Sequence, residues 1–384
     1  MRKLILSLVL LAGAENAAAD TLAEAMSTAA ETNPSLGAQR QRLRAAREAL
    51  PQAWAEALPQ VQVGGVAART DRDGDAPGVD TPPEEAWTAT ATGSQLIFGS
   101  GRVLASTRAA RAQIRGAVAD YDLVLQTLLL DVTRAYADVR QTQAVVSARE
   151  TTVANLTRLF EFARAQFDAG VVTRTDVAQS QARLAQARTQ LVQAQGAMAA
   201  AVQAYQRLVG RAPSALEAPP ATQGLPTDLQ SALDAAGRDS PILRGATADA
   251  QLADANVDVA AAQGRLRVTF EATAGEGADF NNDLTEATTD SVGLRVSVPL
   301  LQGGLVRSRT RAQRALRAAS NLDLAAAQRS VQESVTNAWT GLASARAAVE
   351  SAAEQVEAAE LAYEGVRLEQ EVGLRSTVEG LDQE

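Results

Sequence analysis

The chain has 384 residues, a formal net charge of −9, and neither Cys nor His. These counts exclude disulfides, thiol chemistry, the usual zinc and copper ligands and the commonest general base. Carboxylates alone can still bind metal, but no motif supports this, so we expect no metal site and no cofactor. No basic tract stands out against the acidic background, and we therefore expect no nucleic-acid partner.

The N-terminus has the pattern of a secretory signal peptide. Two basic residues precede an apolar run over residues 4–13, and the alanines at 17–19 form a small-residue cleavage site. We therefore predict a signal peptide over residues 1–19 and a mature chain that begins at Asp20. The apolar run is too short to span a bilayer, and no later stretch is apolar enough for a transmembrane helix, so any membrane crossing would use β-strands.

The first part of the mature chain changes from helical to extended patterns. One short helical pattern ends at Asn33-Pro34 and a second, over residues 36–57, ends at Leu58-Pro59, because the residue before a proline avoids helical backbone angles. Alternating apolar and polar residues then predict strands at about 60–68 and 86–98. The Asp-, Gly- and Pro-rich stretch between these strands predicts an exposed loop.

A long helix is predicted at about residues 102–169. Valine, leucine or phenylalanine recurs every seven residues from Val118 to Phe167, and a repeat of this length drives supercoiling against neighbouring helices. Gly170 interrupts the pattern. A return helix with the same spacing follows at about 175–209.

The second part of the chain repeats this plan. Repeat 1 covers residues 20–210, a linker covers 211–228, and repeat 2 covers 229–384. Repeat 2 has predicted strands at about 266–274 and 291–299, an acidic loop over 275–290, and a long helix at about 304–372. Gly170 recurs as Gly373, 203 residues later. On that offset the second return helix would extend about thirty residues past Glu384, so we expect it to be truncated in this chain.

The turn after each long helix carries the candidate site residues. Glycine suits a sharp helix end, because it tolerates positive φ. Thr173-x-x-Asp176 and Ser376-x-x-Glu379 each have the pattern of a capping box that starts a return helix. Capping and a functional role do not exclude each other at these acidic positions.

These motifs, in this order, resemble the TolC family of outer-membrane efflux and type I secretion channels. The matching landmarks are Asn33-Pro34, Leu58-Pro59, Leu96-Ile97-Phe98-Gly99, Phe167-Asp168-Ala169-Gly170-Val171, Thr175-Asp176-Val177, Val298-Pro299-Leu300 and Val372-Gly373-Leu374-Arg375-Ser376. The resemblance implies α plus transmembrane β structure, in which each repeat supplies two strands and a long coiled-coil hairpin. Four strands cannot close a barrel, whereas a homotrimer would form a 12-stranded β-barrel in the outer membrane, continued by a helical tunnel in the periplasm.

The resemblance also implies partners and site residues. The chain would be a passive exit duct in outer-membrane lipid, opened at its periplasmic tip by an adaptor (membrane fusion) protein and an inner-membrane transporter. The adaptor-contacting residues would be Gly170, Val171, Gly373, Leu374, Arg375 and Ser376. The gate links would be Thr175, Asp176 and Arg375, and the acidic constriction would be Glu379 and Asp382. Three copies of these two carboxylates would form rings that favour cations.

Two other functions compete with the channel. A periplasmic adaptor also carries a long helical hairpin, but it would need a compact β-domain flanking one hairpin, and this chain has two hairpins and four separate strands. A secreted coiled-coil interaction protein would need neither lipid-facing alternation nor detergent. An enzyme is disfavoured, because no phosphate-binding loop or nucleophile motif is present.

Overall fold

The computed structural model describes residues 20–70, 84–220, 222, 224–279 and 282–371, and the predicted signal peptide lies outside these ranges. The chain divides into two compact units. Unit 1 comprises Met1–Ala38, Leu123–Ala232 and Val335–Glu384, and unit 2 comprises Gln39–Asp122 and Leu233–Ser334. The elements are α1 (Leu22–Thr32), α2 (Pro34–Arg47), α3 (Ala49–Ala55), β1 (Gln60–Thr70), β2 (Glu84–Phe98), α4 (Arg102–Asp168), α5 (Arg174–Val209), α6 (Leu229–Asp239), α7 (Pro241–Ala262), β3 (Arg267–Asp279), β4 (Asn282–Ser297) and α8 (Leu305–Glu371).

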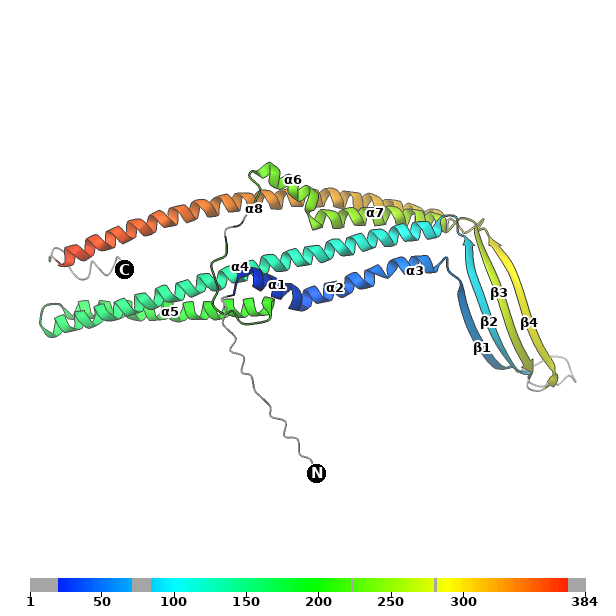
Figure 1. Ribbon diagram of the computed structural model, residues 1–384, viewed down its shortest axis with the longest axis horizontal. Coiled ribbons are helices and arrows are strands. Elements are labelled where there is room, and N and C mark those ends of the chain that lie inside the picture. Colours follow the sequence, from blue (N-terminus) through cyan, green and yellow to red (C-terminus); the bar gives the residue numbers. More distant parts are fainter. Residues whose placement is uncertain (1–19, 71–83, 221, 223, 280–281, 372–384) are drawn as a thin grey trace, which may run out of the picture. The chain divides into compact units, whose positions relative to one another are not determined.

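All four strands form one antiparallel sheet in unit 2, in the order β1-β2-β3-β4 (Figure 1). The central pair joins β2 and β3, which are separated in sequence by four helices. Gln60 at the start of β1 pairs with Ser94 near the end of β2, and Arg267 at the start of β3 pairs with Ser297 at the end of β4. The connections to helices therefore all leave from one end of the sheet.

The register gives the sheet one mostly apolar and one mostly polar face. Directly paired residues of antiparallel strands point to the same face, so the alternation of each strand can be followed across the whole sheet. The mostly apolar face carries Val61, Val63, Trp87, Ala89, Ala91, Phe270, Ala272, Ala274, Val292, Leu294 and Val296, and the register also places Gln95, Glu276, Thr288 and Asp290 on it. The mostly polar face carries Gln60, Gln62, Thr88, Thr90, Thr92, Ser94, Thr269, Glu271, Thr273, Ser291 and Arg295, and the register also places Val66 and Leu96 on it. On the polar face, Arg295 Nε donates to Glu271 Oε1 at 2.7 Å across the β3–β4 pair.

A β-bulge extends the apolar face to the end of the sheet. Leu96 pairs with Thr269 and Phe98 pairs with Val268, so Ile97 is an extra residue in β2. If regular pairing continued through Ile97, Ile97 would pair with Val268 and Phe98 would point to the polar face, because side chains alternate with a period of two. The bulge instead places Phe98 beside Val268 on the apolar face, where its ring is 52% exposed.

The predicted loop over residues 275–290 is wrong for most of its length, because β3 continues to Asp279 and β4 begins at Asn282. Local composition suggested a loop, but backbone pairing with neighbouring strands overrides it. Gly275 and Gly277 lie where the backbone of β2 leaves little room for a side chain. A Cβ at Gly277 would lie 2.9 Å from Trp87 O, and one at Gly275 would lie 3.1 Å from Ala89 O. Glycine in a strand can mark such a close backbone approach.

The helix predicted over residues 36–57 is also wrong as a single element. It divides into α2 and α3 at Glu48. Pro51 has no N–H to donate to the carbonyl of Arg47, so the helical hydrogen-bond ladder is interrupted there. Asn33 joins α1 to α2, because its Oδ1 accepts from the backbone N–H of Ser35 at 3.0 Å.

The long helices α4 and α8 each contain 67 residues. In unit 1, α4 and α5 pack through Leu156, Leu184 and Ala187, and the heptad residue Val139 of α4 is fully buried. The same seven-residue register in α8 is open, with Val349 71% exposed. Among the described helices, none is both long and apolar enough to span a bilayer.

Candidate functional site

The turn between α4 and α5 is built on a left-handed glycine. Gly170 has φ of 76°, its N–H donates to Phe167 O, and the N–H of Val171 donates to Gln166 O, both at 2.9 Å. These two bonds form a Schellman motif, which satisfies carbonyls that the end of α4 leaves unpaired. Val171 follows directly and is 70% exposed. The turn therefore presents the apolar side chain of Val171 to solvent on a hydrogen-bonded backbone.

The return helix begins with a capping box. Thr173 is the N-cap of α5, and its backbone N–H donates to Asp176 Oδ2 at 2.9 Å, while the N–H of Asp176 donates to Thr173 Oγ1 at 3.4 Å. The Thr173 hydroxyl also donates to Asp176 Oδ2 at 2.9 Å. One oxygen of Asp176 is thus occupied within its own turn, which is the structural role that the sequence pattern left open. Thr175 is exposed beside it.

The structure brings Gly170, Val171, Thr175 and Asp176 together at one hairpin tip. The predicted counterparts Gly373, Leu374, Arg375, Ser376, Glu379 and Asp382 lie outside the described residues.

A buried polar network in unit 1 was missed by the sequence analysis. Asp20 is 2% exposed, and its backbone N–H donates to Ala215 O at 2.9 Å. Its Oδ1 accepts from Arg211 Nη2 at 2.6 Å, and its Oδ2 accepts from the N–H of Ser214 at 3.1 Å. The N–H of Glu217 also donates to Asp20 O at 3.3 Å, so four hydrogen bonds join the first residue of the predicted mature chain to the segment after α5.

Two tyrosines complete this network. The Tyr136 hydroxyl lies 2.7 Å from Asp20 O and 2.8 Å from Glu217 O, so its single proton is shared between two carbonyls. The rings of Tyr136 and Tyr205 are 6.5 Å apart, and the Tyr205 hydroxyl is buried without a hydrogen-bond partner in the described part of the chain. Burial raises the pKa of both phenols, so both stay neutral at physiological pH.

The charge of Asp20 is stabilised inside this network. Burial alone would raise the pKa of the Asp20 carboxyl, but the hydrogen bonds from Ser214 and the bonded, positively charged Arg211 outweigh burial and hold it below its usual value. Asp20 is therefore ionised at neutral pH. The arrangement offers no exposed reactive group, so it anchors the chain rather than binding a ligand.

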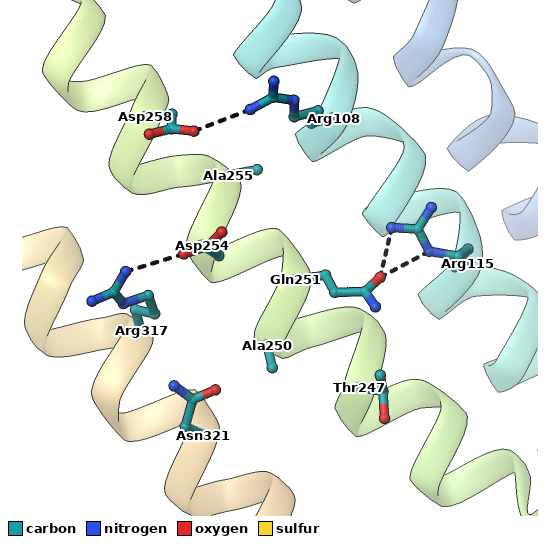
Figure 2. Close-up of a pocket in the computed structure, with 10 residues that line it drawn as sticks. All are labelled: Arg108, Arg115, Thr247, Ala250, Gln251, Asp254, Ala255, Asp258, Arg317 and Asn321. Carbon is teal, nitrogen blue, oxygen red and sulfur yellow. Dashed lines mark hydrogen bonds and ion pairs between the residues drawn. The ribbon is translucent and has the colours of Figure 1, made fainter. Parts of the chain in front are cut away.

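A groove of about 560 Å³ in unit 2 lies along α7, between α4 and α8. Figure 2 shows that its charges are used in helix pairing. Arg108 of α4 reaches Asp258 at 3.3 Å, and Arg317 of α8 reaches Asp254 at 3.1 Å. Arg115 of α4 donates two hydrogen bonds to Gln251, the shorter at 2.6 Å.

The three α7 acceptors are spaced by three and four residues, so they lie along one face of the helix. Each of these ion pairs is largely exposed and contributes roughly 0–1 kcal/mol, so their main effect is to fix how α7 is placed against its neighbours. The groove therefore has no free row of cations for a ligand. Within the residues that the structure describes, no group of three or more acidic side chains could hold a metal ion.

The sequence matches one family model over most of its length and is similar to known outer membrane efflux and related proteins. The family model described as outer membrane efflux protein matches residues 25–211 and 232–384. The outer membrane efflux protein BepC of Brucella suis is 28% identical over 292 residues, 75% of this chain and 64% of the relative. Protein CyaE of Bordetella pertussis is 29% identical over 264 residues, 66% of this chain and 55% of the relative. The chain thus spans less than two thirds of these two relatives.

Solved structures show the same fold. The outer membrane protein VceC of Vibrio cholerae superposes with a TM-score of 0.76 at 19% identity, covering 94% of this chain and 89% of VceC. The family match confirms the predicted resemblance, the predicted localisation in the outer membrane and the prediction that the chain is not an enzyme. This chain belongs to the outer membrane efflux protein family.

Proposed function

We propose that the chain is the outer-membrane channel of a tripartite efflux or type I secretion system. The observation that carries this proposal is the sheet, whose four strands share one mostly apolar and one mostly polar face and connect to helices at one end only. An apolar face suits lipid, and a face of Thr, Ser and Gln suits a water-filled lumen. The channel itself would carry out no chemistry. It would open when its partners shift the population of its conformations from closed to open.

Open sheet edges support a homotrimer. The outer edges of β1 and β4 have no neighbour within the described chain, and unpaired backbone groups are not tolerated in lipid. Three copies would pair these edges and close a 12-stranded β-barrel. The exposed heptad residues of α8, such as Val349 and Val356 at 71% and 58% exposure, would then pack against neighbouring helices in a periplasmic tunnel made of two hairpin repeats per chain.

The hairpin tips would be the partner-binding end of the tunnel. Gly170 and Val171, with Gly373, Leu374, Arg375 and Ser376 of the second tip, would contact a periplasmic adaptor that links the channel to an inner-membrane transporter. Thr175, Asp176 and Arg375 would link neighbouring helices in the closed state, and Glu379 and Asp382 would form the acidic constriction. The exposed apolar side chain of Val171, on a hydrogen-bonded turn, supports the adaptor contact.

The test is the mass in detergent of the mature chain extracted from outer-membrane fractions. We expect a trimer that aggregates when detergent is removed. A matched pair of variants tests the two faces. Val292→Arg places a charge on the apolar face and costs about 2–4 kcal/mol in lipid, so it should abolish trimer recovery. Ser291→Arg places the same charge on the polar face and should be tolerated.

A soluble monomer that needs no detergent would refute the channel and favour the adaptor or another coiled-coil interaction protein. Equal effects of the two substitutions would refute the assignment of the faces. The sheet also disfavours an adaptor, because all four strands form one sheet and not a compact β-domain beside a single hairpin.

A further inference from the structure

The start of α8 carries cations that no described residue neutralises. Arg307, Arg311 and Arg314 are spaced by four and three residues, so they lie on one face of the helix and form what we call the α8 arginine stripe. All three are exposed, and in the described chain their guanidinium groups make no hydrogen bond or ion pair. Two further arginines of this segment have partners, because Arg309 donates to Gln263 at 2.9 Å and Arg317 donates to Asp254 at 3.1 Å.

The local charge differs sharply from that of the whole chain. The formal net charge is −9, yet no Asp or Glu occurs between Asp290 and Asp323, and six arginines lie in that interval. Of the three arginines outside the stripe, Arg295 pairs with Glu271 in the sheet, Arg309 bonds Gln263 just after α7, and Arg317 bonds Asp254 of α7. The three positive charges of the stripe are therefore not paired with any described residue of the fold.

An exposed apolar segment directly precedes the stripe. Leu300 and Leu301, in the connection between β4 and α8, are 90% and 94% exposed. At the same end of the sheet, Ile97 and Phe98 of β2 are 58% and 52% exposed. Apolar side chains followed within two helical turns by arginines are typical of a membrane interface, where the apolar groups enter the acyl region and the cations stay among the headgroups.

We propose that the α8 arginine stripe binds the phosphate groups of anionic phospholipids in the periplasmic leaflet of the outer membrane. This inference rests on the proposed function, because the channel is what places the sheet in lipid and α8 below it. At 1.5 Å per residue the stripe spans about 10 Å of helix axis, comparable with a headgroup layer plus the reach of an arginine side chain. Arginine also presents a planar fork that pairs with two phosphate oxygens.

Lipid explains the stripe better than a second copy of the chain does. A second copy would have to supply carboxylates to the stripe and apolar cover to Leu300 and Leu301 at the same place. An anionic phospholipid supplies both in one molecule, since it joins a phosphate to acyl chains. The contact would hold the barrel at a fixed depth, with the sheet–helix junction at the membrane surface.

The experiment measures binding of short-chain phosphatidylglycerol and phosphatidylcholine to the purified full chain in neutral detergent. The test variant is Arg307→Gln/Arg311→Gln/Arg314→Gln. The matched control is Arg40→Gln/Arg44→Gln/Arg47→Gln on α2, which has the same spacing and the same change of charge but ends well before β1. The control therefore shows whether a loss of binding depends on where the three charges lie or only on how many are removed.

We expect wild type to bind phosphatidylglycerol at least about tenfold more tightly than phosphatidylcholine, and about 0.5 M salt to reduce this preference. The stripe variant should bind phosphatidylglycerol about a hundredfold more weakly, from a contribution of about fivefold for each cation near an anionic surface. The α2 variant should stay within about twofold of wild type. If the triple variant does not fold, each single substitution should show its own loss of about fivefold.

Equal binding of the two lipids by wild type, or equal losses in the stripe and α2 variants, would overturn the headgroup site. So would a stripe variant that keeps its lipid preference but loses its oligomeric mass, because the stripe would then contact a second copy. Insertion of wild type into phosphatidylcholine vesicles separates the two proposals. Failure to insert would refute the proposed channel function. Normal insertion without a preference for phosphatidylglycerol would refute only the proposed headgroup site.

Discussion

The hydroxyl of Tyr136, in the middle of α4, lies 2.7 Å from the carbonyl oxygen of Asp20. This contact joins residues 116 positions apart, and both are almost fully buried. The same hydroxyl reaches Glu217 O at 2.8 Å, so one side chain connects the start of the predicted mature chain, the long helix and the segment after α5. Tyr136 therefore fixes the path of the chain where three segments meet.

Tyr136→Phe should destabilise the protein by about 1–2 kcal/mol, because it removes the hydroxyl donor to the carbonyls of Asp20 and Glu217 while keeping the ring packing. Thermal unfolding of the mature chain in detergent measures the change. Tyr121→Phe, on the same helix and only partly buried, is the control and should have little effect. Equal losses in the two variants would show that the hydroxyl contact does not contribute as the distances indicate.

Asp20→Asn should weaken the fold in a pH-dependent way. Because the folded-state pKa of Asp20 is below the unfolded value of about 3.9, the carboxylate stabilises the fold above that pH. The contribution is lost as the pH falls through the lower, folded-state pKa. The difference in unfolding temperature between wild type and Asp20→Asn should therefore be constant from about pH 7 to pH 5 and shrink below about pH 4.

The size of that difference should be modest, about 1–2 kcal/mol, since Arg211 is 46% exposed and water screens its charge. Unfolding curves of both proteins across the pH range provide the measurement. A difference that grows on acidification would contradict the lowered pKa of Asp20.

The sequence predicted most of what depends on nearby residues. The seven-residue spacing located α4 and α5, and Gly170 and Thr173 marked the end of one helix and the start of the next. These features are local, because a cap or a heptad is decided within one or two helical turns. The break at Glu48 was equally local, and Pro51 was the signal that could have located it.

What the sequence did not predict depends on contacts between distant segments. The bulge at Ile97 is visible only once β2 is aligned with β3, and the strand character of Gly275 and Gly277 comes from the backbone of β2. The contact of Tyr136 with Asp20 has no sequence signal beyond a lone tyrosine on a helix. The α8 arginine stripe is itself local, and the spacing of its residues was the signal that could have located it, whereas the absence of described partners is visible only in the structure.

Gly170→Ala should destabilise the hairpin by about 1–2 kcal/mol, because a Cβ strains the left-handed backbone at φ of 76° even though the space beside it is open. Gly196→Ala is the matched control. Gly196 lies inside α5 with nothing near its Cβ position, so alanine there should stabilise the helix by up to about 1 kcal/mol. Thermal unfolding should thus show shifts of opposite sign, and shifts of the same sign would contradict the turn geometry.

Thr173→Ala and Asp176→Asn separate capping from gating at the hairpin tip. Thr173→Ala removes the N-cap acceptor and should cost about 1 kcal/mol of stability with little effect on ion flow. Asp176→Asn keeps an oxygen that can accept from the N–H of Thr173, so it should cost less stability. If Asp176 also links neighbouring helices in the closed tunnel, its neutralisation should raise single-channel conductance in planar bilayers. Unfolding and conductance measured on both variants decide between the roles. A loss of stability in Asp176→Asn as large as that in Thr173→Ala, with unchanged conductance, would leave capping as the role of Asp176 and remove it from the gate.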